Sequence, residues 1–94
     1  EGASVKILSP RNDHTVSGSY VNIRFKLIKG KIGNHVHAYV DEELMGMFSP
    51  DEGSLNGQGA VIDIQPGHRT LELRVVTKTH TELDATDRAY FVVK

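Results

Sequence analysis

The stretch SYVNIRFKLI, residues 19–28, decides the fold class of this 94-residue chain. Its apolar side chains stand at every second position, and polar or charged side chains fill the positions between them. Successive side chains of a β-strand point to opposite faces, so this alternation is typical of a strand with one face on a hydrophobic core. The predicted inward residues are Val21, Ile23, Phe25 and Leu27.

The two-residue period recurs along the chain, and no window keeps the i, i+3, i+4 spacing of an amphipathic helix. Segments rich in Gly, Pro, Asn and Asp separate the alternating stretches and predict turns. About seven short strands with turn signals roughly every 8 to 12 residues are typical of an antiparallel β-sandwich, so we predict one all-β domain over residues 1–94. A further short strand is predicted through Leu44 and Phe48, and the other predicted inward residues are Val5, Ile7, Val36, Ala38, Val40, Ala60, Ile62, Ile64, Leu71, Leu73, Val75, Ala89, Phe91 and Val93.

Two long stretches resemble bacterial immunoglobulin-like modules. VKILSPRNDHTVSGSYVNIRFKL, residues 5–27, is similar to their opening, in which a short strand and a Ser-Pro turn lead through a TVSG step into the second strand. PGHRTLELRVVTKTHTELDATDRAYFVVK, residues 66–94, is similar to their closing hairpin. The resemblance implies an immunoglobulin-like β-sandwich, although the chain lacks the Cys pair and the Trp of antibody-type domains.

Composition excludes several function classes. The formal net charge is −1 and the basic residues form no long cluster, which disfavours nucleic acid and anionic lipid as partners. The chain has no cysteine, so a metal must be bound by His, Asp, Glu or Met. No apolar run is long enough to span a bilayer, and we expect a monomeric domain without membrane insertion. Because the first residue is Glu1 rather than Met, we expect a mature or excised domain.

Three histidines are predicted to converge on one face of the sandwich. In an immunoglobulin-like fold the strand at residues 35–40 lies antiparallel to the strand at residues 69–78, which in turn pairs with the last strand. His35 and His37 alternate with the inward residues of their strand, so both project outward. Counting by twos along the outer face of residues 69–78 leads to His80 at the same end. The outward positions in that count are Glu72, Arg74, Val76, Lys78 and His80.

Three imidazoles at one place can bind copper or zinc, because a neutral imidazole nitrogen suits both ions. The predicted metal ligands are therefore His35, His37 and His80. Glu82 or Asp84, in the loop that follows, could supply a carboxylate. The alternative interpretation is that the three histidines are separate, solvated side chains.

The closing segment RVVTKTHTELDATDRAYFVVK, residues 74–94, also resembles small periplasmic copper-binding proteins of the copper-resistance C type. Those proteins are Cys-free sandwiches with a histidine between the last two strands, so the resemblance implies that His80 is a copper ligand. It also implies a periplasmic or extracellular location. The chain departs from that family in starting at Glu1 rather than at a histidine, in having the H-x-H pair, and in keeping only Met45 and Met47 of a methionine-rich stretch.

A second group of metal-binding residue types is predicted at the opposite end of the sandwich. His14 and His68 lie in turns there, and Met45 and Met47 share parity on a short strand near that end. Thioethers favour Cu(I). The alternative is that the two methionines fill irregular packing beside Phe48.

A metalloenzyme of the cupin type is a further alternative, because cupins bind one metal with H-x-H, a Glu and a later His inside a β-barrel. Glu42 and His68 would complete that set, but the core alternation points His35 and His37 outward, and Glu42 has the opposite parity. No nucleophile elbow or nucleotide-binding motif occurs, so we predict a binding domain and not an enzyme.

A protein or carbohydrate interaction module is the main alternative to metal binding. Immunoglobulin-like sandwiches commonly bind partners through loops or through an exposed sheet face. Tyr39, Arg74, Tyr90 and the histidines would then form a mixed aromatic and charged patch.

Overall fold

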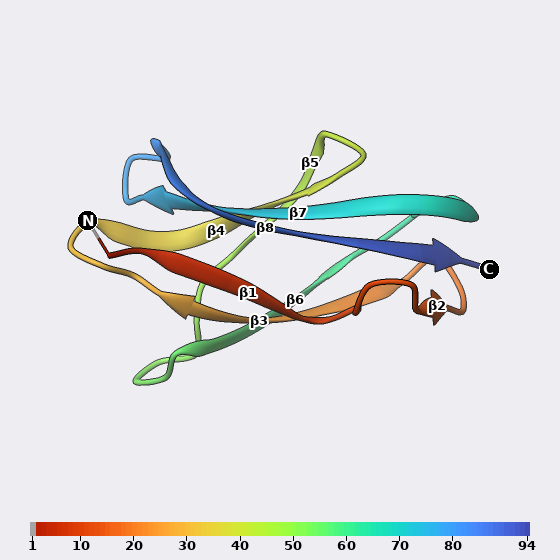
Figure 1. The fold of residues 1–94 in the computed structure, drawn as a ribbon, viewed down its shortest axis with the longest axis horizontal. Coiled ribbons are helices and arrows are strands. Elements are labelled where there is room, and N and C mark those ends of the chain that lie inside the picture. The colour runs from red at the N-terminus through yellow and green to blue at the C-terminus, as the bar shows by residue number, and fades with distance from the viewer. Residues whose placement is uncertain (1) are drawn as a thin grey trace.

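The computed structural model describes residues 2–94 and consists of two β-sheets packed face to face (Figure 1). The strands are β1 (Ser4–Ser9), β2 (Thr15–Val16), β3 (Val21–Ile28), β4 (Gly33–Val40), β5 (Glu43–Phe48), β6 (Asn56–Val61), β7 (Gly67–Thr77) and β8 (Glu82–Val93). One sheet has the order β1-β3-β6 and the other the order β2-β8-β7-β4-β5. The described residues contain no helix, and so none that could cross a membrane. The predicted all-β sandwich is confirmed, with eight strands where the pattern predicts about seven.

β3 has the alternation that residues 19–28 predict. Its inward side chains, from Val21 to Leu27, are at most 1% exposed, and the side chains between them are exposed. They pack against the inward residues of β4, β7 and β8 in one continuous hydrophobic core. Burying an aliphatic or aromatic side chain of this kind contributes about 1.5 to 3 kcal/mol, so this interface between the sheets is the main source of stability.

The predicted register of residues 60–64 is wrong. Ile62 is 56% exposed, and Ala60 pairs with Asn22 on the outer side of the three-stranded sheet. Val61 is buried instead, at 1% exposure, and Ile64 alone of the three predicted inward residues belongs to the core.

Two inward glycines account for this difference. β6 begins at Asn56, within a stretch whose Gly and Asn content predicts a loop, and Gly57 and Gly59 pair with inward residues of β3. A side chain at Gly57 would collide with the Phe25 ring, and one at Gly59 would collide with the Phe48 ring. Glycine therefore makes room for two aromatic rings here, whereas composition alone indicates a turn.

The strand neighbours that bring the histidines together are as predicted. β4 pairs antiparallel with β7, and β7 pairs antiparallel with β8. β8 is longer than its sequence pattern indicates, because it begins at Glu82 rather than at Asp87. β2 lies in a segment predicted to be a turn, and it pairs parallel with the end of β8.

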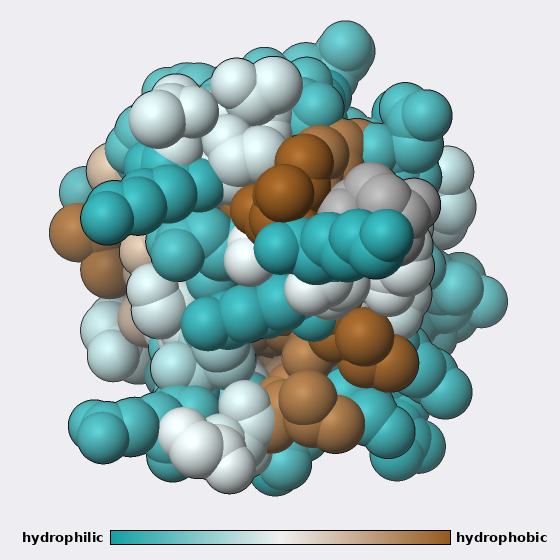
Figure 2. Space-filling view, turned by 90° about the vertical axis from the view of Figure 1, so that its left-hand side faces the viewer, coloured by the Kyte–Doolittle hydropathy of each residue, from teal (hydrophilic) through white to brown (hydrophobic). Residues whose placement is uncertain are grey.

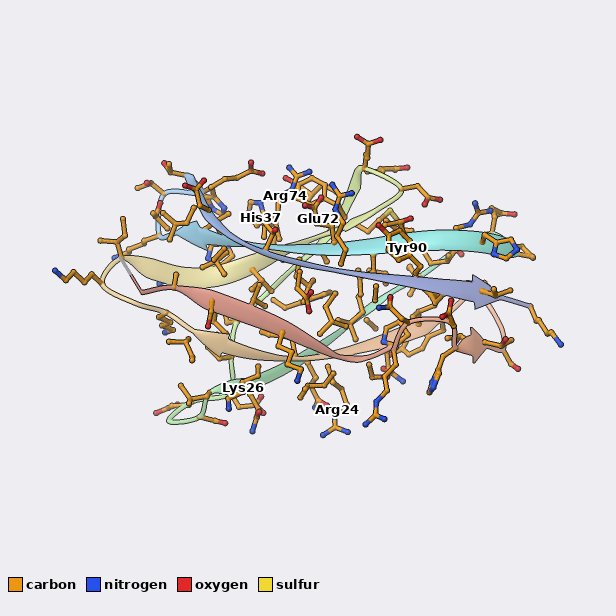
Figure 3. The ribbon with its side chains drawn as sticks, viewed as in Figure 1. Arg24, Lys26, His37, Glu72, Arg74 and Tyr90 are labelled. Carbon is orange, nitrogen blue, oxygen red and sulfur yellow. The ribbon has the colours of Figure 1, made fainter. Side chains whose placement is uncertain are left out.

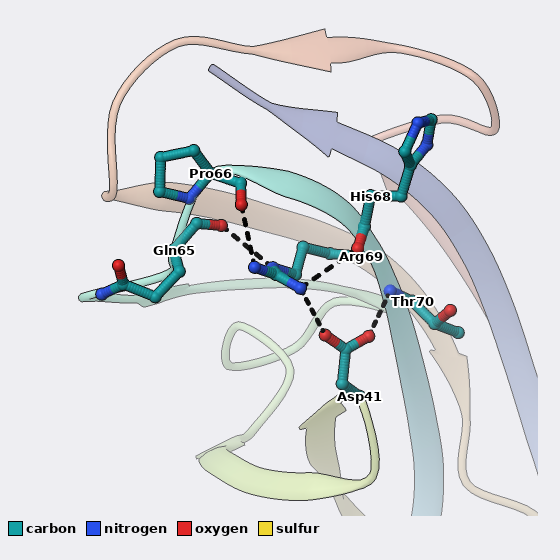
Figure 4. A network of polar contacts seen from close by, with 6 residues as sticks. All are labelled: Asp41, Gln65, Pro66, His68, Arg69 and Thr70. Carbon is teal, nitrogen blue, oxygen red and sulfur yellow. Dashed lines mark hydrogen bonds and ion pairs between the residues drawn. The ribbon is translucent and has the colours of Figure 1, made fainter.

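Asp41 and Arg69 hold the β4–β5 hairpin against the start of β7 (Figure 4). Asp41 and Glu42 form a two-residue connection with φ values of 49° and 71°, which suits the twist of a tight hairpin. The Asp41 carboxylate accepts a hydrogen bond from the N–H of Thr70 at 2.9 Å and one from the Arg69 guanidinium at 3.2 Å. The same guanidinium donates to the carbonyl oxygens of Gln65, Pro66 and His68.

Candidate metal centre

The outer face of the five-stranded sheet carries both histidines of β4. Directly opposed residues of an antiparallel ladder share a face, and His37 lies opposite Arg74 while His35 lies opposite Val76. The residues of β4 that alternate with the histidines are buried in the core. His35 and His37 therefore project away from the core, as their parity predicts. Figure 3 shows His37 beside Arg74 on this face.

His80 reaches the same place through a turn. The count by twos treats residues 69–80 as one strand, whereas β7 ends at Thr77. The Thr77 carbonyl accepts the N–H of His80 at 2.9 Å, and the Thr77 hydroxyl accepts the N–H of Thr81 at 3.1 Å. His80 itself has a φ of 69°, a left-handed conformation that reverses the chain. His80 thus lies beside His35 and His37 as predicted, but a turn after β7 places it there rather than a continuous strand.

The three imidazole rings lie against one another. Nε2 of His37 is 3.0 Å from Nδ1 of His80, and the ring centroids of the three pairs are 5.2, 4.9 and 5.1 Å apart. One nitrogen of each ring lies within 4.8 Å of the other two. Two bonds of roughly 2.0 to 2.1 Å to a shared ion allow nitrogens up to about 4.2 Å apart, so a small inward movement of the rings suffices to bind one ion.

Burial and mutual repulsion favour the neutral forms of the two β4 histidines. His35 is 8% exposed and His37 is 7% exposed. Burial lowers the pKa of both, and the neighbouring imidazoles lower it further, while Glu82 acts in the opposite direction on His37. A neutral imidazole keeps the lone pair that a metal requires, so both rings are prepared for binding at neutral pH.

Asn34 orients the His35 ring. Its amide oxygen lies 2.9 Å from Nδ1 of His35. An amide oxygen can only accept a hydrogen bond, so Nδ1 is the donor and Nε2 carries the free lone pair. A partner of this kind fixes the tautomer and the ring orientation of a metal-binding histidine.

Val76 forms an apolar floor next to the histidines. It is fully buried, yet it is not part of the core cluster between the sheets. In register it lies between His35 on β4 and Glu82 on β8. Its predicted place on the outer face agrees with this register, and its complete burial means that other side chains cover it from the outer side. Val76 therefore gives His35 an apolar neighbour on this face.

An ion-pair network adjoins the histidine group. Arg74 donates to Glu82 at 2.9 Å and to Glu72 at 2.9 Å, and it stacks on Tyr39 with 4.0 Å between the guanidinium carbon and the ring centroid. Tyr39 also donates to Glu82 at 3.1 Å. The hydrogen bonds from Arg74 and Tyr39 lower the pKa of Glu82 and keep its carboxylate occupied. Of the described residues, only the three histidines make up the group of potential ligands, and Asp84 and Glu82 lie outside it.

Among residues 2–94, the histidines at the other end of the sandwich do not join a group of potential metal ligands. His14 and His68 both lie beside Val92 near the end of β8, and both are exposed. Glu42 lies in the β4–β5 turn, at the opposite end of β4 from His35. The ligand set of the cupin alternative is therefore not assembled.

The two methionines face different sides because of a β-bulge. The β4–β5 register shifts between Ala38 and Tyr39, so Met47 lies opposite His37 on the outer face. Met45 packs against the core instead. The prediction that they share a face is wrong, since alternation assumes an uninterrupted ladder. The sequence pattern therefore did not predict that Met47 lies beside His37, because alternation along β5 does not reveal the bulge.

Fold and site together define an immunoglobulin-like β-sandwich with a three-histidine candidate metal centre on its outer sheet face. No protein-family model matches the chain, and no curated protein matches it by sequence. Solved structures with the same fold do match.

The chain is similar to the fibronectin(III)-like modules of CbhA from Clostridium thermocellum, with a TM-score of 0.73, 16% identity and coverage of 96% of this chain and 95% of that chain. It is similar to CopC from Methylosinus trichosporium OB3b, with a TM-score of 0.59, 14% identity and coverage of 98% and 93%. It is also similar to a lytic polysaccharide monooxygenase from Jonesia denitrificans, with a TM-score of 0.62, 20% identity and coverage of 90% of this chain but 60% of that chain. At these identities the likeness establishes the fold, and it confirms the immunoglobulin-like sandwich with its weaker resemblance to copper-resistance C proteins.

Proposed function

We propose that this domain binds a copper or zinc ion through His35, His37 and His80 and serves as an extracytoplasmic binding domain rather than an enzyme. The observation that carries the proposal is the convergence of one nitrogen from each ring within 4.8 Å. Three protein ligands leave a coordination position on the solvent side, where a further ligand can bind and exchange.

Three further features support this function. The lowered pKa values of His35 and His37 favour the neutral rings, and Asn34 selects the tautomer of His35 that presents Nε2. The resemblance of residues 74–94 to the copper-resistance C type, together with the fold shared with CopC, supports copper rather than zinc and a periplasmic or extracellular location.

The test is a titration of the 15N-labelled domain with Zn(II), Cu(II) and Cu(I), followed by imidazole and amide NMR. We expect the three histidines to respond together and at one equivalent of metal, and the response to be lost when the rings protonate at acidic pH. His68→Asn serves as the matched control, because His68 is an exposed histidine at the far end. Independent responses of the three rings, or equal loss of binding in His68→Asn and His37→Asn, would contradict the proposal.

The second candidate function is contact with a carbohydrate or protein partner through the same outer face. Tyr90 is 53% exposed, and Arg74 stacks on Tyr39 farther along this sheet. Figure 2 views the end of the sandwich that carries the β7–β8 turn, and its hydrophobic side chains form separate groups among hydrophilic ones. Titration with soluble oligosaccharides, followed by the NMR signals of the Tyr90 ring, tests this candidate. We expect these signals to shift on binding, and we expect Tyr90→Ala to bind more weakly.

A further inference from the structure

We propose that Met47 is a fourth ligand of the three-histidine site and makes that site selective for Cu(I) over Zn(II). This inference rests on the proposed metal binding and specifies the metal. It assigns a role to an exposed thioether that the fold places next to the histidines.

The bulge in the β4–β5 hairpin brings Met47 to the site. From the pairing of Tyr39 with Leu44, an uninterrupted antiparallel ladder would set His37 opposite Gly46 and turn Met47 toward the core. The register shift adds one residue to β5, so His37 faces Met47 instead. The same shift turns Phe48 inward, where its ring lies against Gly59 and stacks with Phe25. Packing of Phe48 against the core therefore holds Met47 on the outer face.

Met47 is close enough and free enough to reach a bound ion. Directly opposed residues of an antiparallel pair have Cβ atoms about 4.5 to 5.5 Å apart, and a methionine side chain has three rotatable bonds. Met47 is 58% exposed and does not belong to the core or to the residues packed against it. Its thioether can thus swing over the His37 ring toward the nitrogens that face His80.

The chemical type of the four ligands determines which metal ion is bound more tightly. Three imidazoles and a thioether give four neutral ligands, and soft thioethers select Cu(I). Zn(II) is bound in proteins by thiolate, imidazole and carboxylate, and gains little from a thioether. The nearest carboxylate, that of Glu82, is held by Arg74 and Tyr39 and lies outside the histidine group. The surroundings of the three rings therefore offer Cu(I) a fourth ligand that Zn(II) does not use.

The chain provides a matched control in Met45. Met45 is two residues away and carries the same side chain, but it packs against the core. Met47→Leu and Met45→Leu each remove one sulfur at nearly constant volume. Cu(I) affinity is measured anaerobically by competition with a chromophoric Cu(I) chelator, and Zn(II) affinity by competition with a fluorescent zinc indicator, for both variants and the unaltered domain.

We expect Met47→Leu to weaken Cu(I) binding at least about tenfold, because even the partners of metal ligands typically contribute that much. Zn(II) affinity should stay unchanged, and Met45→Leu should match the unaltered domain for both ions. The Met47 methyl resonance should shift with one equivalent of Cu(I) and not with Zn(II). This methyl readout separates ligation from an indirect effect of the substitution.

Results of two kinds would overturn the inference, and they can be told apart. If Met47→Leu binds Cu(I) as tightly as the unaltered domain, or if the domain binds Zn(II) but not Cu(I), Met47 is not a ligand and the three-histidine function stands. If the unaltered domain binds neither ion, or if His37→Asn binds both ions unchanged, the proposed function fails together with the inference.

Discussion

His37 and His80, which are 43 residues apart in the chain, face each other with 3.0 Å between Nε2 and Nδ1. The contact depends on the antiparallel pairing of β4 with β7 and on the turn that carries His80 back over the sheet. A change that disturbs this meeting affects metal binding, whereas a change in the core affects stability.

Acidification should destabilise the domain. Burial and the neighbouring imidazoles lower the folded-state pKa of His35 and His37 below the ordinary value of 6.5. Between the ordinary and the lowered values the unfolded chain binds more protons than the folded domain, so the free energy of unfolding falls as the pH falls through this window. Urea unfolding at about pH 7.5 and about pH 5 measures the effect. The double variant His35→Asn, His37→Asn should depend less on pH, and an equal dependence in both proteins would exclude these histidines as the cause.

Removal of the Asn34 side chain should weaken metal binding without removing a ligand. Asn34→Ala frees Nδ1 of His35 and lets the ring adopt the wrong tautomer or orientation. Losses of about 10- to 100-fold in affinity are typical for partners of this kind. Competition with a zinc indicator gives the affinity. Asn34→Asp keeps an accepting oxygen and should retain most of the binding, so a comparable loss in both variants would argue against the tautomer explanation.

Val61, the last residue of β6, and Ile62, which follows it, should differ in their contribution to stability. Val61→Ala removes a fully buried side chain and should cost about 1.5 to 3 kcal/mol of unfolding free energy. Ile62→Ala removes a larger side chain that is 56% exposed and should change the unfolding free energy by at most about 0.5 kcal/mol. Urea denaturation of both variants measures these changes. If Ile62→Ala were more destabilising than Val61→Ala, the register that simple alternation predicts for residues 60–64 would be the correct one.

A side chain at Gly59 should destabilise the domain while Phe48 is present. In Gly59→Ala the new methyl group meets the Phe48 ring, and overpacking of this kind typically costs about 1 to 3 kcal/mol. Phe48→Leu opens space at the same place, so the double variant should lose less stability than the sum of the two single variants. A double-mutant cycle based on thermal or urea unfolding measures the coupling. Simple additivity would show that the two residues do not compete for space.

The amino-acid pattern by itself determined the fold class and most of the core. The inward residues of β3, β4, β7 and β8 can be recognised without tertiary information, because a strand with one buried face must bury every second residue. The same parity places His35 and His37 on the outer face. Knowledge of which strands pair in such a sandwich then predicts that His80 lies near them.

Three other features were decided by the tertiary structure, because alternation in the sequence does not specify them. The inward glycines of β6 match loop composition, and only the Phe25 and Phe48 rings explain why they lie in a strand. Whether Met47 or Gly46 lies beside His37 depends on one bulge, and a single added residue exchanges the faces of everything that follows it. Distances between side chains 43 residues apart come from the packing of the whole sandwich, because a period of two assigns a face and not a position on it.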